Sequence, residues 1–200
     1  ILTFFSLLLL IVYVAMMDGS HESMLKNALK VYTGAIEIYQ KNYRDLGGNE
    51  YLINQVDTIE KALLTIKGIE QFTSRYETYG LLSSKENSAA SMVAGINPDK
   101  EKHMSQLEVA LKEGEFLKQN SGNCLYAGIG LVKKLSINVG DEVSFIGSAS
   151  DNSFAADLFK LCGIFKTGSA QFDGATSFVA RQYFDQLMYS QNKASYINIK

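Results

Sequence analysis

Two glycine-containing segments look like parts of nucleotide-binding loops. Gly128-Ile129-Gly130 could open a G-x-G-x-x-G loop, but Lys133 stands where the third glycine belongs. No clear strand precedes this segment, and no acidic residue follows it in the ribose-binding place. Lys166-Thr167-Gly168 has the wrong residue order for a Walker A loop. We therefore expect the first two glycines to serve packing at a helix start, and we expect no ATP site in this chain.

The histidines and cysteines are too few and too scattered to suggest catalysis. His21 and His103 are the only histidines, and neither has His or Cys at metal-ligand spacing, so we expect both on the surface. Cys124 and Cys162 could pair in an oxidising compartment, which would stabilise the fold by roughly 3–4 kcal/mol. Because Cys162 lies in an apolar predicted strand, we favour a buried free thiol. No carboxylate pair suits acid–base work, and the sequence predicts no catalytic, cofactor-binding or metal site.

Composition excludes several classes of protein. The 200 residues are 46% hydrophobic and 20% charged, with a net charge of −2. Such a balance argues against a general nucleic-acid binder, because no basic excess exists to neutralise phosphates. One proline excludes a proline-rich or collagen-like chain, and two cysteines exclude a disulfide scaffold. The length fits one domain, or one domain with a small lobe.

The first 17 residues carry no charge and predict a transmembrane helix. As a helix they would span roughly 26 Å, slightly less than a bilayer core of about 30 Å. Because the chain does not begin with Met, we expect that its start has been truncated. A signal peptide and a buried core helix are the alternatives. A signal peptide usually has a shorter apolar region and a small-residue cleavage site, and a core helix seldom stays apolar on every face.

Residues 18–33 predict an amphipathic stalk helix that continues from the membrane. Apolar residues recur three and four positions apart, as in the stripe of a helix that faces other protein. The first Lys or Arg after the apolar segment is Lys26, which favours a non-cytoplasmic exit. Gly19 is a candidate flexible point. The candidate residues for mechanical coupling are Asp18, Gly19, Leu25 and Leu29.

The remaining sequence predicts a mixed α+β fold. The predicted strands are 35–39, 69–83, 88–96, 143–146, 154–165, 176–180 and 194–199. The predicted helices are 57–66, a helix that starts with Asn97 as its cap and Pro98 in its first turn, 126–135 and 180–189. Residues 43–56 are expected to be mostly loop, and 107–117 are ambiguous. Strand–helix–strand order at both ends predicts two βαβ-like lobes with a strand-rich lobe inserted between them.

Five segments, taken in order, resemble the extracytoplasmic core domain of MacB/FtsX-like ABC transporter permeases. The closest resemblance is to the lipoprotein-releasing LolC/LolE type. The segments are 16–19 with 34–39, 93–101, 112–117, 127–135 with 139–143, and 161–168 with 172–173. Each motif is weak alone, but their order and spacing extend over nearly the whole chain.

The resemblance implies a permease subunit that has no active site of its own. Residues 34–200 would form the extracytoplasmic domain, on the periplasmic side of a bacterial inner membrane from about residue 18. A cytoplasmic ABC ATPase would bind ATP and Mg²⁺ as partner, and a second permease subunit, identical or different, would complete the transporter. A lipoprotein or a periplasmic carrier is a further possible partner, and no nucleic acid is expected.

One segment departs from the lipoprotein-releasing type. There, the hairpin that docks the carrier chaperone can be long and contain proline, whereas residues 147–154 are short, polar and without proline. This places chaperone docking in doubt. The candidate partner-contact residues in this hairpin are Ser148, Ser150, Asp151, Asn152 and Phe154. A single-pass membrane-anchored sensor or ligand-binding module is the main alternative function, and a membrane-anchored enzyme is a third hypothesis.

Overall fold

The computed structural model describes Tyr32 and residues 36–200. The predicted membrane helix and the predicted coupling residues Asp18, Gly19, Leu25 and Leu29 lie outside this range. Within the described part of the chain, no helix is long and apolar enough to cross a membrane. The membrane anchor and the stalk therefore remain predictions from the sequence.

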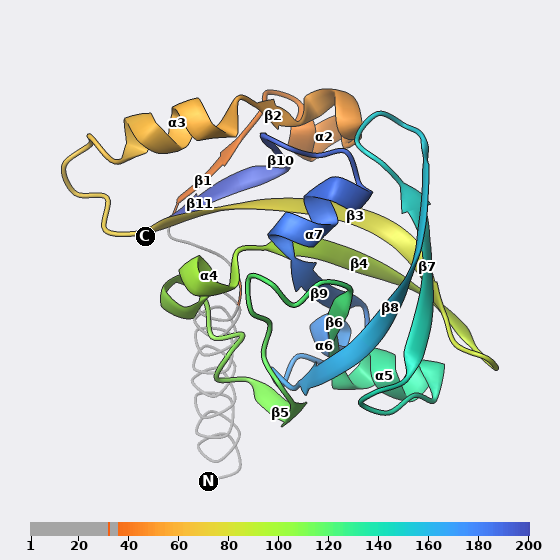
Figure 1. Cartoon of the computed structure of the whole chain (residues 1–200). Coiled ribbons are helices and arrows are strands. Elements are labelled where there is room, and N and C mark those ends of the chain that lie inside the picture. The colour runs from red at the N-terminus through yellow and green to blue at the C-terminus, as the bar shows by residue number, and fades with distance from the viewer. Residues whose placement is uncertain (1–31, 33–35) are drawn as a thin grey trace, which may run out of the picture.

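The described residues form a nine-stranded sheet, a two-stranded sheet and short helices (Figure 1). The strands are β1 (Ile36–Tyr39), β2 (Ile53–Asn54), β3 (Phe72–Ser83), β4 (Ser88–Ile96), β5 (Leu111–Gly114), β6 (Cys124–Gly128), β7 (Glu142–Ser148), β8 (Phe154–Phe165), β9 (Thr176–Ala180), β10 (Lys193–Ala194) and β11 (Tyr196–Ile199). The helices are α2 (Tyr43–Leu46), α3 (Val56–Leu63), α4 (Pro98–Met104), α5 (Ile129–Leu135), α6 (Ala170–Asp173) and α7 (Arg181–Leu187), with a 3₁₀ turn η1 (Asn49–Tyr51).

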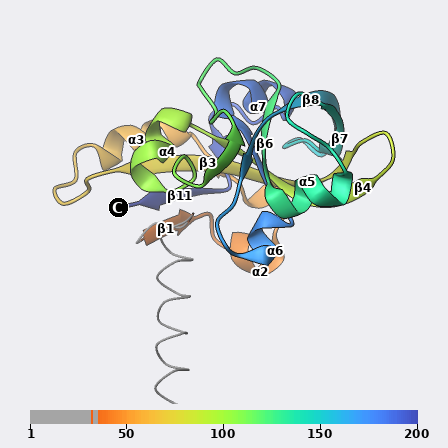
Figure 2. The same ribbon diagram turned by 90° about the horizontal axis from the view of Figure 1, so that it is seen from below.

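Six strands of the large sheet close into a ring. The sheet order is β1-β11-β3-β4-β9-β6-β8-β5, and β7 pairs with both β3 and β8. These pairings close β3, β4, β9, β6, β8 and β7 on one another. The inside of the ring is filled by buried side chains of its strands and by α5 and α7, among them Leu82, Phe145, Phe159, Leu131 and Phe184. Helix α5 lies at the end of the ring that is lowest in Figure 1 and is seen from below in Figure 2.

The two strand–helix–strand units interleave in this one sheet, which corrects the prediction of separate lobes. Strand β11 lies between β1 and β3 and is antiparallel to both. The unit β1–α3–β3 therefore has parallel strands, and the last strand of the unit β9–α7–β11 is inserted between them. The units interleave because β11 returns to the start of the chain. The α+β class itself agrees with the prediction.

Most predicted elements appear at their predicted places, and the exceptions are short or uniformly apolar. Strands β4, β8 and β9 have the predicted bounds, and Asn97 caps α4 through bonds from two backbone N–H groups at 3.1 and 3.3 Å. The helix predicted over 126–135 is wrong at its start, because strand β6 runs through Gly128 and α5 begins only at Ile129. Leu125-Tyr126-Ala127 is buried throughout, and an apolar run of this length fits a strand or a helix equally well.

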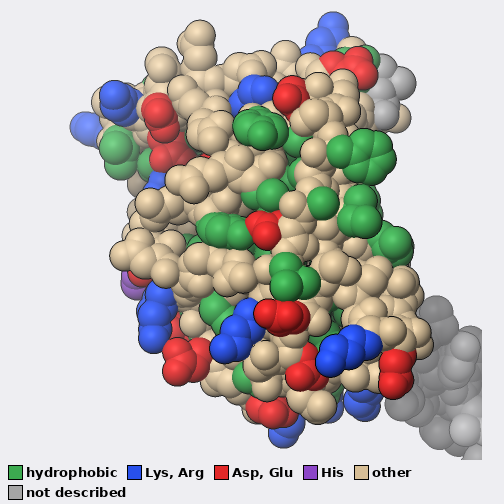
Figure 3. All heavy atoms as spheres, turned by 45° about the vertical axis from the view of Figure 1, so that its right-hand side comes forward, with side chains coloured by type: hydrophobic (Ala, Val, Ile, Leu, Met, Phe, Trp, Pro, Cys, Tyr) green, Lys and Arg blue, Asp and Glu red, His purple; other side chains and the backbone are tan. Residues whose placement is uncertain are grey.

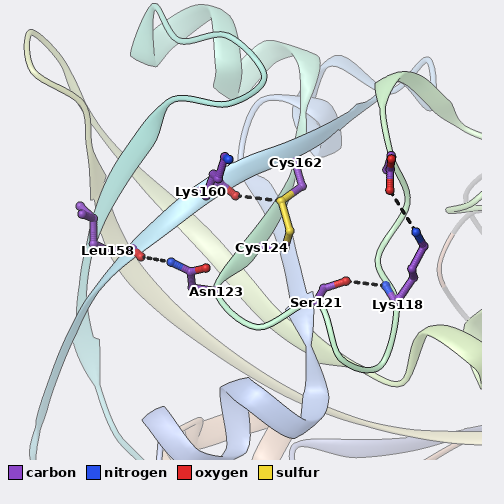
Figure 4. Close-up of a disulfide and its surroundings, with 8 residues drawn as sticks. Lys118, Ser121, Asn123, Cys124, Leu158, Lys160 and Cys162 are labelled. Carbon is purple, nitrogen blue, oxygen red and sulfur yellow. Dashed lines mark hydrogen bonds and ion pairs between the residues drawn. A yellow bond between two sulfur atoms is a disulfide. The ribbon is translucent and has the colours of Figure 1, made fainter.

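The two cysteines form a disulfide, so the preferred prediction of a buried free thiol is wrong. Cys124 and Cys162 bridge β6 and β8, with their Cα atoms 5.5 Å apart (Figure 4). The parallel register pairs Leu125 with Leu161 and then Tyr126 with Gly163, so Cys162 is an extra residue in a bulge. The bulge turns its side chain out of the core, toward the start of β6. Both cysteines are partly exposed.

Candidate functional site

The first described residue, Tyr32, is fixed to the domain by a buried ion pair. Arg75 on β3 donates from Nε and Nη2 to the two carboxylate oxygens of Glu101 on α4, at 2.7 and 2.8 Å. Neither side chain has any solvent exposure. Arg75 Nη1 donates to the backbone carbonyl of Tyr32, and the guanidinium carbon lies 3.9 Å from the centre of the Tyr32 ring. One arginine therefore joins Tyr32 to a strand and a helix, and we call this arrangement of Tyr32, Arg75 and Glu101 the anchor.

Local sequence places Glu101 where it can reach Arg75. Strand β4 neighbours β3 and ends at Ile96, and the capping by Asn97 starts α4 at once. Pro98 suits the first helical turn, because its ring fixes φ near the helical value and it has no N–H to leave unpaired. Glu101 follows within the first turn and is 1% exposed. An acidic group there also favours the positive end of the helix dipole.

Phenol groups and two further carboxylates, those of Glu77 and Glu37, extend the cluster. The Tyr32 and Tyr196 hydroxyls both donate to Glu77 Oε1, and the Tyr39 hydroxyl donates to Glu37 at 2.6 Å. The neighbours of Asn198 determine the orientation of its side-chain amide. The amide oxygen accepts from Arg75 Nη1 at 2.7 Å, and the amide nitrogen donates to Glu37 Oε1 at 3.1 Å. Apart from Tyr32, the groups come from β1, β3 and β11, which lie side by side in the sheet.

Burial controls the ionisation of this cluster. It raises the pKa of the Tyr32 and Tyr196 phenols, and the neighbouring Glu77 charge raises it further. Burial also raises the pKa of the Glu77 carboxyl, while hydrogen bonds from Tyr196 and Tyr32 oppose the shift. Burial alone would lower the pKa of Arg75, but the charge and hydrogen bonds of Glu101, together with Tyr32 and Tyr196, outweigh burial, so the pKa is raised. The phenols therefore stay neutral donors and Arg75 stays charged.

Aromatic packing holds the Tyr32 ring from the other side. Its centroid lies 5.5 Å from that of Phe172 on α6 and 5.3 Å from that of Phe178 on β9. Both contacts have tilted geometry, which aromatic pairs favour. Tyr32 is 8% exposed and belongs to a core cluster on the outside of the ring. A displacement of Tyr32 would thus act on α4, α6, β3 and β9 together.

An open groove lies beside the anchor. Its volume is about 590 Å³, and Glu77 and Tyr196, which bond to one another next to the anchor, contribute to its wall. Tyr39 and Tyr43 stack with centroids 5.7 Å apart, and the Arg44 guanidinium carbon lies 5.2 Å from the centre of the Tyr39 ring. The remaining lining residues are Gly47, Gly48, Asn49, Leu52, Thr78 and Tyr79. The groove combines aromatic rings with one acidic and one basic group.

The predicted partner-contact residues lie together at the tip of the β7–β8 hairpin, but their exposure differs. Phe154 is 89% exposed, and Ser148, Asp151 and Asn152 are also exposed. Ser150 is 6% exposed, and its backbone N–H donates to the Met188 carbonyl at 2.9 Å. Ser150 thus fastens the hairpin to the end of α7.

The glycine segment that resembles a nucleotide-binding loop and the residue His103 both have structural roles. A Cβ atom on Gly128 would lie 2.3 Å from the Asp173 carbonyl oxygen, and one on Gly130 would lie 2.9 Å from Gly174 Cα. Both glycines thus allow close packing of β6 and α5 against α6, as predicted. His103 is exposed, and its carbonyl accepts a hydrogen bond from Lys200 Nζ at 3.2 Å. Among the described residues, no three His, Cys, Asp or Glu side chains gather to hold a metal.

The anchor could not be recognised from the sequence. Arg75 and Glu101 are 26 positions apart on different predicted elements, and no spacing rule joins them. The available signal was an arginine, Arg75, within a predicted strand rich in aromatic residues, because a buried arginine requires a partner. That signal predicts that a partner exists but does not identify it.

The fold has solved counterparts. No protein-family model matches the chain, and no curated protein matches it. The extracellular domain of the noncanonic ABC-type transporter YknZ from Gram-positive bacteria superposes with a TM-score of 0.55 at 15% identity, covering 82% of this chain and 81% of that one. The periplasmic region of MacB from Actinobacillus actinomycetemcomitans gives a TM-score of 0.58 at 14% identity, covering 82% and 72%. The described domain therefore has the fold of extracytoplasmic domains of MacB- and YknZ-type ABC transporters.

Proposed function

We propose that this chain is the extracytoplasmic part of an ABC transporter permease subunit. One observation carries the proposal: 82% of the chain shares its fold with two extracytoplasmic domains of ABC-type transporters. ATP and Mg²⁺ would be bound by a cytoplasmic ATPase partner, and this chain would catalyse no reaction itself. A second permease subunit would complete the transporter in the bacterial inner membrane, with the domain on the periplasmic side.

The Tyr32 anchor supplies a route for the coupling that this function requires. Residues 18–33 are predicted to connect the membrane segment to the domain, and Tyr32 is the one residue of this stretch that the structure describes. The Arg75–Glu101 pair ties its carbonyl to β3 and α4. A buried bidentate pair resists sliding because each shift breaks charge-assisted bonds. Movement of the stalk would therefore displace the domain as a unit.

Release of lipoproteins from the membrane is a narrower form of this function. The β7–β8 turn spans only residues 149–153 between the two strands, and Ser150 is held against α7. A carrier that docks on an extended hairpin would have few exposed turn residues to contact here. We therefore propose transport as the primary function and leave the cargo unspecified. Lipoprotein release is a narrower hypothesis within it.

The test is coupling between the ATPase and this domain. The full-length protein would be expressed in membranes with the ABC ATPase encoded beside it, and co-purification and ATP hydrolysis would be measured. The double variant Arg75→Met/Glu101→Leu removes both buried charges and releases the Tyr32 carbonyl. It should leave the complex assembled but weaken the effect of the extracytoplasmic domain on ATP hydrolysis.

A matched control is the exposed pair Lys118–Glu115, whose side chains are 77% and 76% exposed. Lys118→Met/Glu115→Leu should leave both complex formation and hydrolysis unchanged. If no ATPase co-purifies with the wild-type protein, the proposed function is wrong. If the ATPase binds but the anchor variant couples normally, Tyr32 is not the route of coupling.

A membrane-anchored ligand-binding or sensor module is the second candidate, and the groove beside the anchor favours it. Tyrosine rings with an adjacent carboxylate can bind an organic cation through cation–π and ionic contacts. The two functions predict different continuations of the gene: further membrane helices for a permease, and one membrane helix followed by a kinase or methyl-accepting region for a sensor. Sequencing the full gene separates them.

A further inference from the structure

The groove beside the anchor contains two groups of opposite charge that lack an ionic partner. Arg44 on α2 and Glu77 on β3 both line it, and neither forms an ion pair with another described residue. Other surfaces differ: Figure 3 shows acidic and basic side chains interspersed along the lower edge of one face, as on an ordinary solvated surface. An acid and a base that share a hollow without neutralising each other suit a ligand that carries both charges.

The carboxylate of Glu77 has room for a further hydrogen-bond donor. In the described part of the chain, its donors are the Tyr32 and Tyr196 hydroxyls, and both bond to Oε1 rather than Oε2. Glu77 is only partly exposed, and a carboxylate removed from water without a counter-ion is costly. The positive charge of Arg75 is near, but it is paired with Glu101. An ammonium group bound to Oε2 would supply the missing counter-ion.

Arg44 forms the basic wall of the groove. Its guanidinium carbon lies 5.2 Å from the centre of the Tyr39 ring. A guanidinium held against a ring keeps its N–H groups available at its edge, where they can bind a carboxylate with two parallel bonds. Gly47 and Gly48 continue the same wall, and a Cβ atom on Gly47 would meet nothing within 4 Å. There is therefore open space for an acid group next to Arg44.

Aromatic rings separate the base from the acid. The Tyr39 ring, which Arg44 contacts, has its centroid 5.4 Å from that of Tyr196, and the Tyr196 hydroxyl donates to Glu77. The contacts thus run from Arg44 to Glu77 through two rings, whereas the charged groups of an α-amino acid are adjacent. The groove volume of about 590 Å³ lies within the usual range for small-ligand sites, about 300–1,000 Å³.

We propose that this groove binds a linear zwitterion of the ω-amino acid class. Its ammonium group would meet Glu77, its carboxylate would meet Arg44, and its apolar chain would lie along the rings of Tyr39 and Tyr196. A simple cation would satisfy Glu77 but would be repelled by Arg44, and a simple anion would meet the reverse conflict. Such binding does not require transport, so a permease as well as a sensor can have this site.

Calorimetric titration of the full-length protein in detergent with 6-aminohexanoate tests for this site. Two probes have the same amino acid chain but one charge each: 6-aminohexanamide keeps the ammonium, and N-acetyl-6-aminohexanoate keeps the carboxylate. Each should bind about ten-fold more weakly than the zwitterion, because each loses one charge-assisted contact. Free glycine, whose charges are adjacent, should be weaker by a similar factor. Equal binding of 6-aminohexanamide and 6-aminohexanoate, or no binding of 6-aminohexanoate at millimolar concentration, would overturn the proposal.

Three variants locate the site. Arg44→Gln changes an exposed side chain, and it should weaken 6-aminohexanoate about ten-fold without weakening 6-aminohexanamide. Glu77→Gln should weaken both amines, and near-UV circular dichroism shows whether the domain stays folded. The matched control is Lys118→Gln, at a 77% exposed position outside the groove lining, and it should leave binding unchanged. Wild-type affinity in Arg44→Gln, or an equal loss in Lys118→Gln, rejects binding at this groove.

Zwitterion binding and the transporter function can fail separately. The titration needs no ATPase, whereas the transporter function is tested by ATP hydrolysis with the partner subunit. Binding without ATPase coupling retains the groove site and rejects the transporter, and coupling without binding does the reverse.

Discussion

Replacement of Glu101 by Gln should be among the most damaging conservative substitutions in the domain. Gln has nearly the same shape as Glu but no charge, so Arg75 would keep a buried positive charge without a counter-ion. Breaking a buried pair by removing one partner costs about 3–5 kcal/mol. The whole domain is stabilised by roughly 5–15 kcal/mol, so one substitution would remove a large part of it.

The magnitude follows from the burial and the geometry of this pair. Both side chains have zero exposure, so water cannot replace the lost carboxylate. The two bonds, at 2.7 and 2.8 Å, have the length of charge-assisted contacts. The amide oxygen of the substituted glutamine could accept from one of the two donors, and its NH₂ group would face the other guanidinium N–H groups.

Urea denaturation followed by tyrosine near-UV circular dichroism measures the effect. Glu101→Gln and Arg75→Met should each lower the free energy of unfolding by about 3–5 kcal/mol. The double variant Arg75→Met/Glu101→Leu should cost less than the sum of the single variants, with an interaction energy of roughly 1–3 kcal/mol. Glu115→Gln in the exposed pair should change stability by less than about 1 kcal/mol. A fully additive double variant, or a Glu101→Gln protein as stable as the wild type, would refute the reasoning.

Three further predictions concern the disulfide, alkaline pH and close backbone packing. Replacing Cys124 and Cys162 by Ser should lower stability by about 2–4 kcal/mol in urea denaturation, and thiol titration of the unfolded wild type should find no free thiol without reductant. Burial raises the pKa of the Tyr32 phenol above 10.0, so the unfolded chain loses this proton first and stability should fall as pH rises past that value. A urea midpoint that is equal at pH 8 and above pH 10, or a fall that Tyr32→Phe does not reduce, argues against this. Gly128→Ala would place a methyl group 2.3 Å from the Asp173 carbonyl oxygen, and thermal unfolding should show a loss of about 1–3 kcal/mol.

Local patterns were sufficient to predict most strands and one helix start. Alternation and bounding turns located β4, β8 and β9, and the Asn97-Pro98 pair located α4, because those signals act within a few residues. The same information could not show that β11 lies between β1 and β3. Strand order is decided by which apolar faces pack together, and short strands have too little local pattern to determine it.

The disulfide was the less favoured alternative and the anchor was not predicted, for a related reason. Cys162 lies in a strand with apolar neighbours, and a regular strand would have kept it facing the core or the solvent according to its position. The bulge opposite Tyr126 breaks that alternation, and its position depends on how β6 and β8 pair. Arg75 likewise required a partner that only the packing of α4 against β3 supplies. Both sites depend on contacts between elements, which no single segment encodes.

The chemistry of the anchor suits a coupling element better than a stabilising one. A buried ion pair contributes little net stability compared with apolar residues of the same size, because desolvation of both charges offsets their attraction. Its distinctive property is that it tolerates only one arrangement of its partners. Arg75 accepts a single position for the Tyr32 carbonyl and a single position for the Glu101 carboxylate. An apolar contact at the same place would allow the predicted stalk to slide on the sheet by fractions of a side chain at little cost. With the anchor in place, Tyr32 and the domain must move together. A small displacement can be transmitted over a distance only under this condition.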